Sequence, residues 1–198
     1  MMKRTLAIII ILMSISASGQ KFSSEVWHKG FIVTVDQDTV RGNVRYDMET
    51  NIVLVSRNGV VQTFTSQKLF YVEIFDSLVE TYRQFYSIPY NVKYDYQVPI
   101  LFEVLYEAPL SLLSRESIVT ETVNSSVYGT SFLQTVVRNT FYFLDKQGTM
   151  KVFSGRKQDL LTIMARKQGQ IKDFIKQNKL NTDDVRDLIR VTAFYNSL

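Results

Sequence analysis

The sequence predicts an α+β protein, in which an antiparallel β-meander of about ten strands, forming a curled sheet or an open barrel, precedes a C-terminal helical cap. From Val26 to Phe153, apolar and polar residues alternate with period two between turn signals, which is typical of antiparallel strands. After Gly155 the apolar residues recur at helical spacing instead. The content of 45% hydrophobic and 21% charged residues fits a globular chain.

The predicted strands are short and separated by polar turns. Phe31, Val33 and Val35 share one face of the first strand, and Asn58-Gly59 suits the positive φ angles of a tight hairpin turn. The alternating segments cover residues 31–35, 39–46, 52–55, 60–64, 69–75, 78–86, 99–107, 110–118, 136–145 and 149–153.

Two connections stand out as predicted loops. Residues 120–131 include eight Ser, Thr, Asn or Gly residues among twelve, which is typical of a mobile segment. Residues 89–99 carry Tyr90, Tyr94 and Tyr96, which we expect either to form an aromatic binding platform or to pack against their own sheet.

The C-terminal helices are predicted from three apolar stripes. Gly169 is expected to break the first two helical segments, and Asn181 to Asp184 supplies a capping start for the last. The stripes are too short to be stable alone, so we expect them to pack on the β domain. Their apolar members are Leu160, Leu161, Met164, Ile171, Phe174, Ile175, Leu180, Val185, Leu188 and Ile189.

An export signal is predicted at the start of the chain. Lys3 and Arg4 precede an apolar run that ends at Ser14, and Ala17-Ser18-Gly19 is typical of a cleavage site. The run is shorter than the roughly 20 residues of a membrane-spanning helix, so we expect no transmembrane segment after cleavage. The predicted organisation is a signal peptide at 1–19, a β domain at 20–155 and a helical segment at 156–198.

Several stretches together are similar to one group of proteins. They are KGFIVTVDQDTVRGNVRY, LFEVLYEAPLSLL, FYFLDKQGTMKVF and the ending IKDFIKQNKLNTDDVRDLIRVTAFYNSL, with its closing Tyr195-Asn196. They resemble an uncharacterised family of small exported proteins from the Bacteroidota. This chain has Gln37-Asp38 where the family often has Gly-Asp, and Ala108 where Gly is frequent. The resemblance implies the fold and export, and it carries no catalytic residues.

Most catalytic and metal chemistry lacks its residues here. With no Cys and one His, the chain offers no thiol nucleophile and no ordinary zinc site, and it has no Gly-x-Ser-x-Gly elbow. We therefore predict no catalytic residues, no metal site and no cofactor. His28, beside Trp27, is interpreted as a strand-edge residue facing solvent or a backbone carbonyl. Replacing it with Ala is expected to change stability by less than about 1 kcal/mol.

The carboxylates form no convincing pair in the sequence. Glu103 and Glu107 would lie about 13 Å apart along a strand, too far for a nucleophile and acid pair, and are interpreted as a solvated face. Asp36 and Asp38 are interpreted as turn residues, because one hairpin offers too few oxygens for calcium.

The basic residues do not indicate nucleic-acid binding. Residues 151–198 carry ten Lys and Arg against five Asp and Glu, but Asp173, Asp183 and Asp187 interrupt the stripe. We therefore predict an exported, non-enzymatic protein of the periplasm or outer cell envelope that binds a ligand or partner through its loops. The partner would be an envelope component or another protein. The alternative is a carboxylate-based hydrolase with an unrecognised site.

The predicted cleavage has a direct test. Because the apolar run is too short to span a bilayer, the exported protein should begin at or near Gln20. The intact mass of the protein recovered after export measures this, and a mass that retains Lys3 and Arg4 would contradict cleavage.

Overall fold

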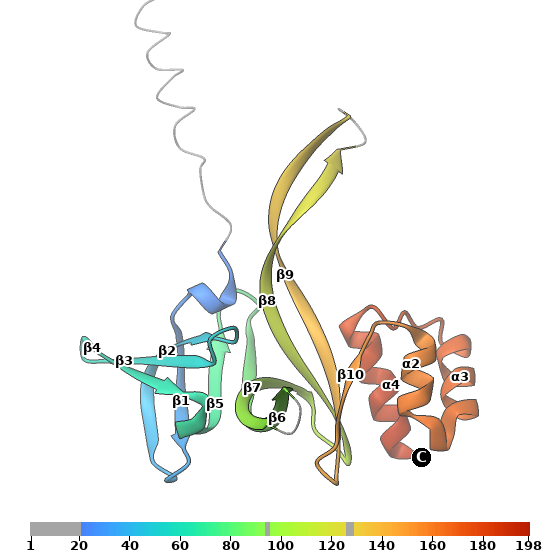
Figure 1. The fold of residues 1–198 in the computed structure, drawn as a ribbon, viewed down its shortest axis with the longest axis horizontal. Helices are drawn as coiled ribbons and strands as arrows, with labels where there is room; N and C mark the ends of the chain where they lie inside the picture. The colour runs from blue at the N-terminus through green and yellow to red at the C-terminus, as the bar shows by residue number, and fades with distance from the viewer. Residues whose placement is uncertain (1–20, 94–95, 126–128) are drawn as a thin grey trace, which may run out of the picture.

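A computed structural model describes residues 21–93, 96–125 and 129–198, and it consists of one antiparallel sheet followed by helices (Figure 1). The predicted α+β class is confirmed. The predicted signal peptide lies outside the described residues. Within those residues, no helix combines the length and apolar character needed to cross a bilayer.

The sheet has ten strands in the order β10-β9-β8-β7-β6-β5-β1-β2-β3-β4. It is open, because its end strands β10 and β4 do not pair, so the barrel form of the prediction is wrong. The strands are β1 (His28–Thr34), β2 (Thr39–Asp47), β3 (Ile52–Arg57), β4 (Val60–Thr65), β5 (Leu69–Asp76), β6 (Thr81–Lys93), β7 (Tyr96–Tyr106), β8 (Leu110–Ser125), β9 (Thr130–Asp145) and β10 (Met150–Phe153).

The short turns follow the sequence closely. Asn58 and Gly59 have φ angles of 52° and 80° and join β3 to β4 as a two-residue hairpin, as predicted. The face that β1 buries is the one with Ile32, which is fully buried, whereas Phe31 and Val33 on the opposite face are only half-buried.

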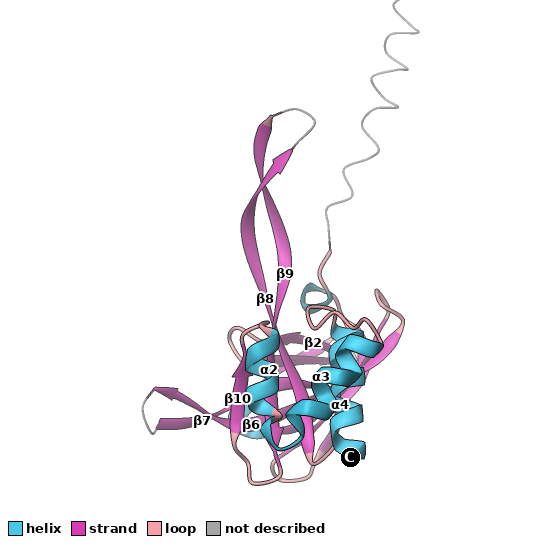
Figure 2. Cartoon of the chain, turned by 90° about the vertical axis from the view of Figure 1, so that its right-hand side faces the viewer, coloured by secondary structure: helices cyan, strands magenta, loops and turns pink. Residues whose placement is uncertain are grey.

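Both predicted loops are wrong over their described parts, where the chain continues as strands. Residues 94–95 and 126–128 of these segments lie outside the described residues. Pro89 pairs with Pro99 across β6 and β7, and Thr120 pairs with Thr135 across β8 and β9. Threonine and valine have high strand propensity, and cross-strand pairing outweighs the loop-like content of Ser, Asn and Gly. Both hairpins extend well beyond the body of the molecule (Figure 2).

The sheet curls so strongly that distant strands meet. Five strand spacings separate β2 from β8, about 24 Å in a flat sheet. Nevertheless, the Tyr46 hydroxyl of β2 donates to Glu116 Oε1 of β8 over 2.6 Å. The concave side encloses the first core, which consists of Ile32, Val44, Tyr46, Met48, Val53, Val55, Leu69, Val72, Ile74, Phe85 and Leu101.

The helices α2 (Lys157–Ile163), α3 (Gln168–Gln177) and α4 (Val185–Ser197) cover the other end of the sheet. Leu160, Ile171 and Leu188 are fully buried against Leu112 and Phe143 of the sheet. The apolar stripes are thus packed on the strands. The interruption before α3 lies at residues 164–167, and not at Gly169, which is inside the first turn of α3.

Side chains hold both ends of α4. The Asp184 carboxylate accepts hydrogen bonds from the backbone N–H groups of Arg186 and Asp187, as the predicted cap requires. The Asn196 side chain accepts from Leu110 N–H at 2.9 Å and donates to Leu110 O at 3.0 Å. This amide therefore joins the helix to the start of β8, because it bonds both the N–H and the C=O of Leu110, as a paired strand residue does.

A substitution at Gly30 tests how closely the backbones of β1 and β5 approach each other. A Cβ added there would lie 2.1 Å from the Glu73 carbonyl oxygen, so Gly30→Ala should destabilise the fold by about 1 to 3 kcal/mol. Gly169→Ala is the control, because that site is open and helical and should gain up to about 1 kcal/mol. Urea unfolding measures both, and equal stabilities would contradict the close approach.

Candidate functional site

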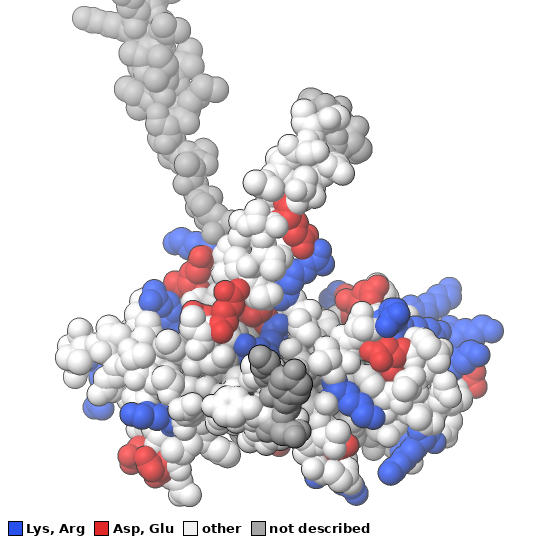
Figure 3. All heavy atoms as spheres, in the orientation of Figure 1, with Lys and Arg blue, Asp and Glu red and all other residues white. Residues whose placement is uncertain are grey.

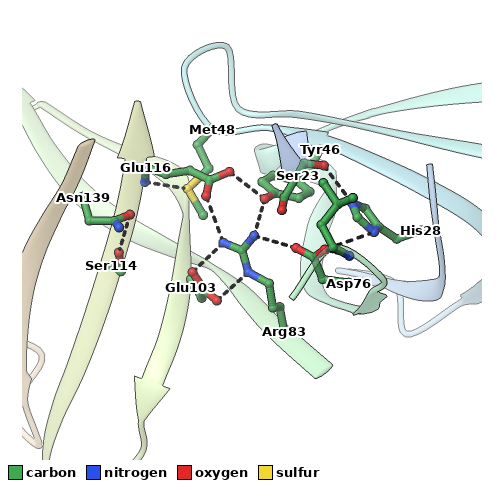
Figure 4. A network of polar contacts seen from close by, with 11 residues as sticks. Ser23, His28, Tyr46, Met48, Asp76, Arg83, Glu103, Ser114, Glu116 and Asn139 are labelled. Carbon is green, nitrogen blue, oxygen red and sulfur yellow. Dashed lines mark hydrogen bonds and ion pairs between the residues drawn. The ribbon is translucent and has the colours of Figure 1, made fainter. Parts of the chain in front are cut away.

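Arg83, near the start of β6, is the centre of a buried polar cluster (Figure 4). Its Nε and Nη2 donate to the two carboxylate oxygens of Glu103, each over 2.7 Å. Nη2 also donates to Glu116 Oε2 over 3.1 Å, and Nη1 donates to Asp76 Oδ2 over 3.2 Å and to the Tyr46 hydroxyl. The Arg83 side chain is only 10% exposed, so these bonds replace water around the guanidinium.

The cluster keeps defined protonation states. Burial would raise the pKa of Asp76, but hydrogen bonds from the Ser23 hydroxyl, the Leu78 N–H and Arg83 lower it below its ordinary value. Burial raises the pKa of Tyr46 far above its ordinary range, so its hydroxyl keeps the proton that it donates to Glu116. The result is a set of carboxylates around one guanidinium, with excess negative charge.

His28 is part of this cluster, and the predicted small effect of its replacement is therefore revised. Its side chain is fully buried, and Nε2–H donates to the Ser23 carbonyl over 2.7 Å, which is the backbone contact that the sequence suggested. Nδ1 lies 3.7 Å from Asp76 Oδ1 and has no hydrogen-bond partner among the described residues. We now expect His28→Ala to cost about 2 to 4 kcal/mol, because it empties a buried site.

A second arginine, the half-buried Arg115, lies on the face of β8 opposite to Glu116. Arg115 donates to Asn51 Oδ1 over 2.9 Å and to the carbonyl oxygens of Leu101 and Met48, and its guanidinium lies 5.5 Å from the centre of the Phe102 ring. Burial lowers the pKa of Arg115. This arginine joins the β2–β3 turn to β7 and β8.

The Arg83 cluster lines an open cleft of about 1140 Å³. Arg83, Glu103 and Glu116 form its floor, together with Ser114 and Asn139, which the close-up view places beside them (Figure 4). The apolar walls come from the β5–β6 turn, the sheet and α4, and include Leu78, Val79, Leu105, Phe141 and Ile189. Lys21 and Arg186 add positive charge to the lining. The cleft thus combines a polar floor with apolar walls, as small-molecule sites do.

The chain was compared with protein-family models, curated proteins and solved structures. No protein-family model, curated protein or solved structure matches it. The interpretation of this site therefore depends on its geometry.

Two of the three tyrosines of the predicted aromatic platform, Tyr90 and Tyr96, lie among the described residues. The Tyr90 ring packs edge-on against Phe102 and Tyr142, with ring centres 5.7 Å and 5.8 Å away, as the alternative interpretation expected. Tyr96 is 67% exposed near the end of the hairpin. Tyr94 lies outside the described residues. A binding role for these tyrosines stays a prediction.

The sequence did not reveal the cluster, and it misplaced one member. Glu103 is half-buried and bonded to Arg83, and not on a solvated face, whereas Glu107 is exposed. One sequence signal was available: opposite charges stand within three successive strands, at Arg83, Glu103 and Glu116. Across residues 21–93, 96–125 and 129–198, no group of three or more His, Asp or Glu side chains could hold a metal ion.

Removing the guanidinium should have a large, pH-dependent effect. Arg83→Met leaves buried carboxylates without their cation, so we expect a loss of about 3 to 5 kcal/mol in the free energy of unfolding. In the native protein, the lowered pKa of Asp76 contributes stability above its ordinary value of 3.8, and this contribution is lost as the pH falls through the folded value. In the variant, the crowded carboxylates should bind protons more tightly when folded, so acid should restore part of its stability.

The measurement is the urea midpoint of both proteins between about pH 7 and pH 4. Arg190→Met is the control, because Arg190 pairs with Asp187 while 54% exposed and should change stability little. If both variants lose equally little, or if acid widens the gap between Arg83→Met and the native protein, the cluster does not have the assigned role.

Proposed function

We propose that this chain is an exported, non-enzymatic protein of the periplasm or outer cell envelope that binds a small ligand in the cleft between the sheet and α4. The observation that carries the proposal is the pairing of a polar floor, built on Arg83 and its carboxylates, with apolar walls in one large cleft. The basic, apolar and small-residue order of residues 1–19 supports export.

The lining indicates the chemistry of the ligand. Oxygens of Glu103 and Glu116 and the amide of Asn139 can bind hydroxyl or amine hydrogens, because a carboxylate only accepts. Leu105 and Phe141 on the walls can cover an apolar group. The cleft therefore suits an amphipathic small molecule with an apolar body and several hydroxyl or amine groups.

The same geometry favours binding over hydrolysis. A carboxyl group that acts as a general acid must have a proton to give. Both oxygens of Glu103 accept hydrogen bonds from Arg83, and Glu116 accepts from Arg83 and Tyr46. Carboxylates held in this way serve as fixed acceptors, and the alternative of a carboxylate hydrolase gains no support from them.

The test is thermal unfolding with alkyl glucosides and alkyl amines as probes, at concentrations that form no micelles. A ligand of the folded state should raise Tm in a saturable way. Asn139→Trp should abolish the rise by filling the cleft, whereas Asn43→Trp, an exposed site on β2 outside the cleft, should retain it. No saturable rise with either probe, or an equal rise in Asn139→Trp, would contradict binding at this cleft.

A further inference from the structure

The outer parts of β8 and β9 form a two-stranded ribbon that leaves the sheet. Residues 115–125 pair with residues 130–140, whereas β7 pairs with β8 only through Leu112 to Ser114, and β10 pairs with β9 only from Phe141 to Leu144. Both views show this ribbon extending away from the body (Figures 1 and 2). Along the ribbon, the outer backbone edge of each strand has no strand beside it in the described structure.

This ribbon lacks the features that normally prevent strand edges from pairing. Edge strands are usually protected by charged side chains, proline or β-bulges. Residues 122–137 contain no Lys, Arg, Asp, Glu or Pro, and the β8–β9 register runs without a bulge from Leu110 to Ser125. The space-filling view shows the charge confined to the base of the ribbon, where Arg138 pairs with Glu121 (Figure 3).

Both faces of the ribbon also expose apolar side chains. Val123 and Phe132 pair on one face, and Thr122 and Leu133 pair on the other. Phe132 is 51% exposed and Leu133 is 73% exposed. A two-stranded ribbon with no covered face is at most marginally stable in water. The ribbon therefore presents a surface that association would stabilise.

The open edges decide what kind of partner fits. Insertion into a bilayer would bury unpaired backbone N–H and C=O groups in hydrocarbon, at several kcal/mol each. Pairing with another strand would satisfy the same groups and cover the apolar side chains at once. The free edges thus favour a strand over a lipid.

The positions of the charged residues indicate which edge of the ribbon, that of β8 or that of β9, can pair with a second copy of the chain. If two β9 strands pair antiparallel about Gln134, each Arg138 lies opposite Thr130, and the two arginines are about 27 Å apart. That separation exceeds the screening length of about 8 Å at physiological salt. The equivalent pairing of β8 about Thr122 would bring two Glu121 carboxylates within about 7 Å. In these two registers, charge favours the β9 edge for pairing with its own copy.

We propose that two copies of this chain associate through the β9 edges of their ribbons, residues 130–138, and form a continuous four-stranded antiparallel sheet. A two-fold axis near Gln134 closes this arrangement, so it yields a dimer and not an open fibre. The outer part of each ribbon projects away from the rest of the chain in both views, so the two bodies stay apart. This inference is independent of the proposed ligand.

The experiment measures the molar mass of the purified protein by light scattering across a concentration series. The native protein should change from monomer to dimer. Thr135→Lys places positive charges near the axis and should raise the dimer dissociation constant by at least about tenfold. Thr120→Lys is the matched control, because Thr120 is exposed and lies directly opposite Thr135 on the other strand of the same ribbon. It should leave the dimer intact.

A second measurement uses the absence of cysteine from the chain. Gln134→Cys should form an intermolecular disulfide under mild oxidation, because residues facing each other across the axis fall within disulfide reach. Thr120→Cys should not. The proposal is overturned if the native protein stays monomeric at every concentration, if Thr120→Lys and Thr135→Lys weaken the dimer equally, or if the monomer binds lipid vesicles through the ribbon instead.

Discussion

One guanidinium holds together strands that the chain separates widely. Arg83 uses all five of its N–H donors: two on Glu103 and one each on Glu116, Asp76 and the Tyr46 hydroxyl. These partners belong to β7, β8, β5 and β2. A buried ion cluster stabilises a fold only when every donor and acceptor is satisfied, because the cost of removing charges from water is large. The five donors of Arg83 meet that condition, whereas Nδ1 of His28 has no hydrogen-bond partner among the described residues. A lysine, with three donors on one atom, could not replace Arg83.

Arg115 makes the complementary connection from the opposite face of β8, one residue before Glu116. Its partners are neutral oxygens of Met48, Asn51 and Leu101, so it fixes the turn after β2 over the start of β8 without a carboxylate. Adjacent residues on a strand point to opposite faces, so Arg115 and Glu116 place polar links on both faces of β8. These two links hold β2 and the turn after it against β7 and β8, where the sheet curls back on itself.

The strands were predictable because alternation is a local property. The ten expected segments correspond to the ten observed strands, and the Asn58-Gly59 turn and the Asp184 cap follow from their own residues. The polar cluster was not predictable in the same way, because Tyr46 and Glu116 are 70 residues apart and meet only in the curled sheet. Asp76 reads as a turn residue and Glu103 as a solvated one until Arg83 is placed between them. The Thr-rich segment misled for a different reason, since threonine is common in both strands and turns.

The amide of Asn196 has a consequence for how the chain reaches its native state. It bonds a residue 86 positions earlier, and β8 cannot gain this neighbour until α4 has formed. Folding of such non-local topologies is slow, because loop-closure entropy must be overcome before the contacts form. Because synthesis runs from the N-terminus, Leu112 of β8 and Phe143 of β9, which pack with α4 in the fold, stay uncovered until the last residues are made. That interval, before α4 is complete, is when the apolar side chains of β8 and β9 can make wrong contacts.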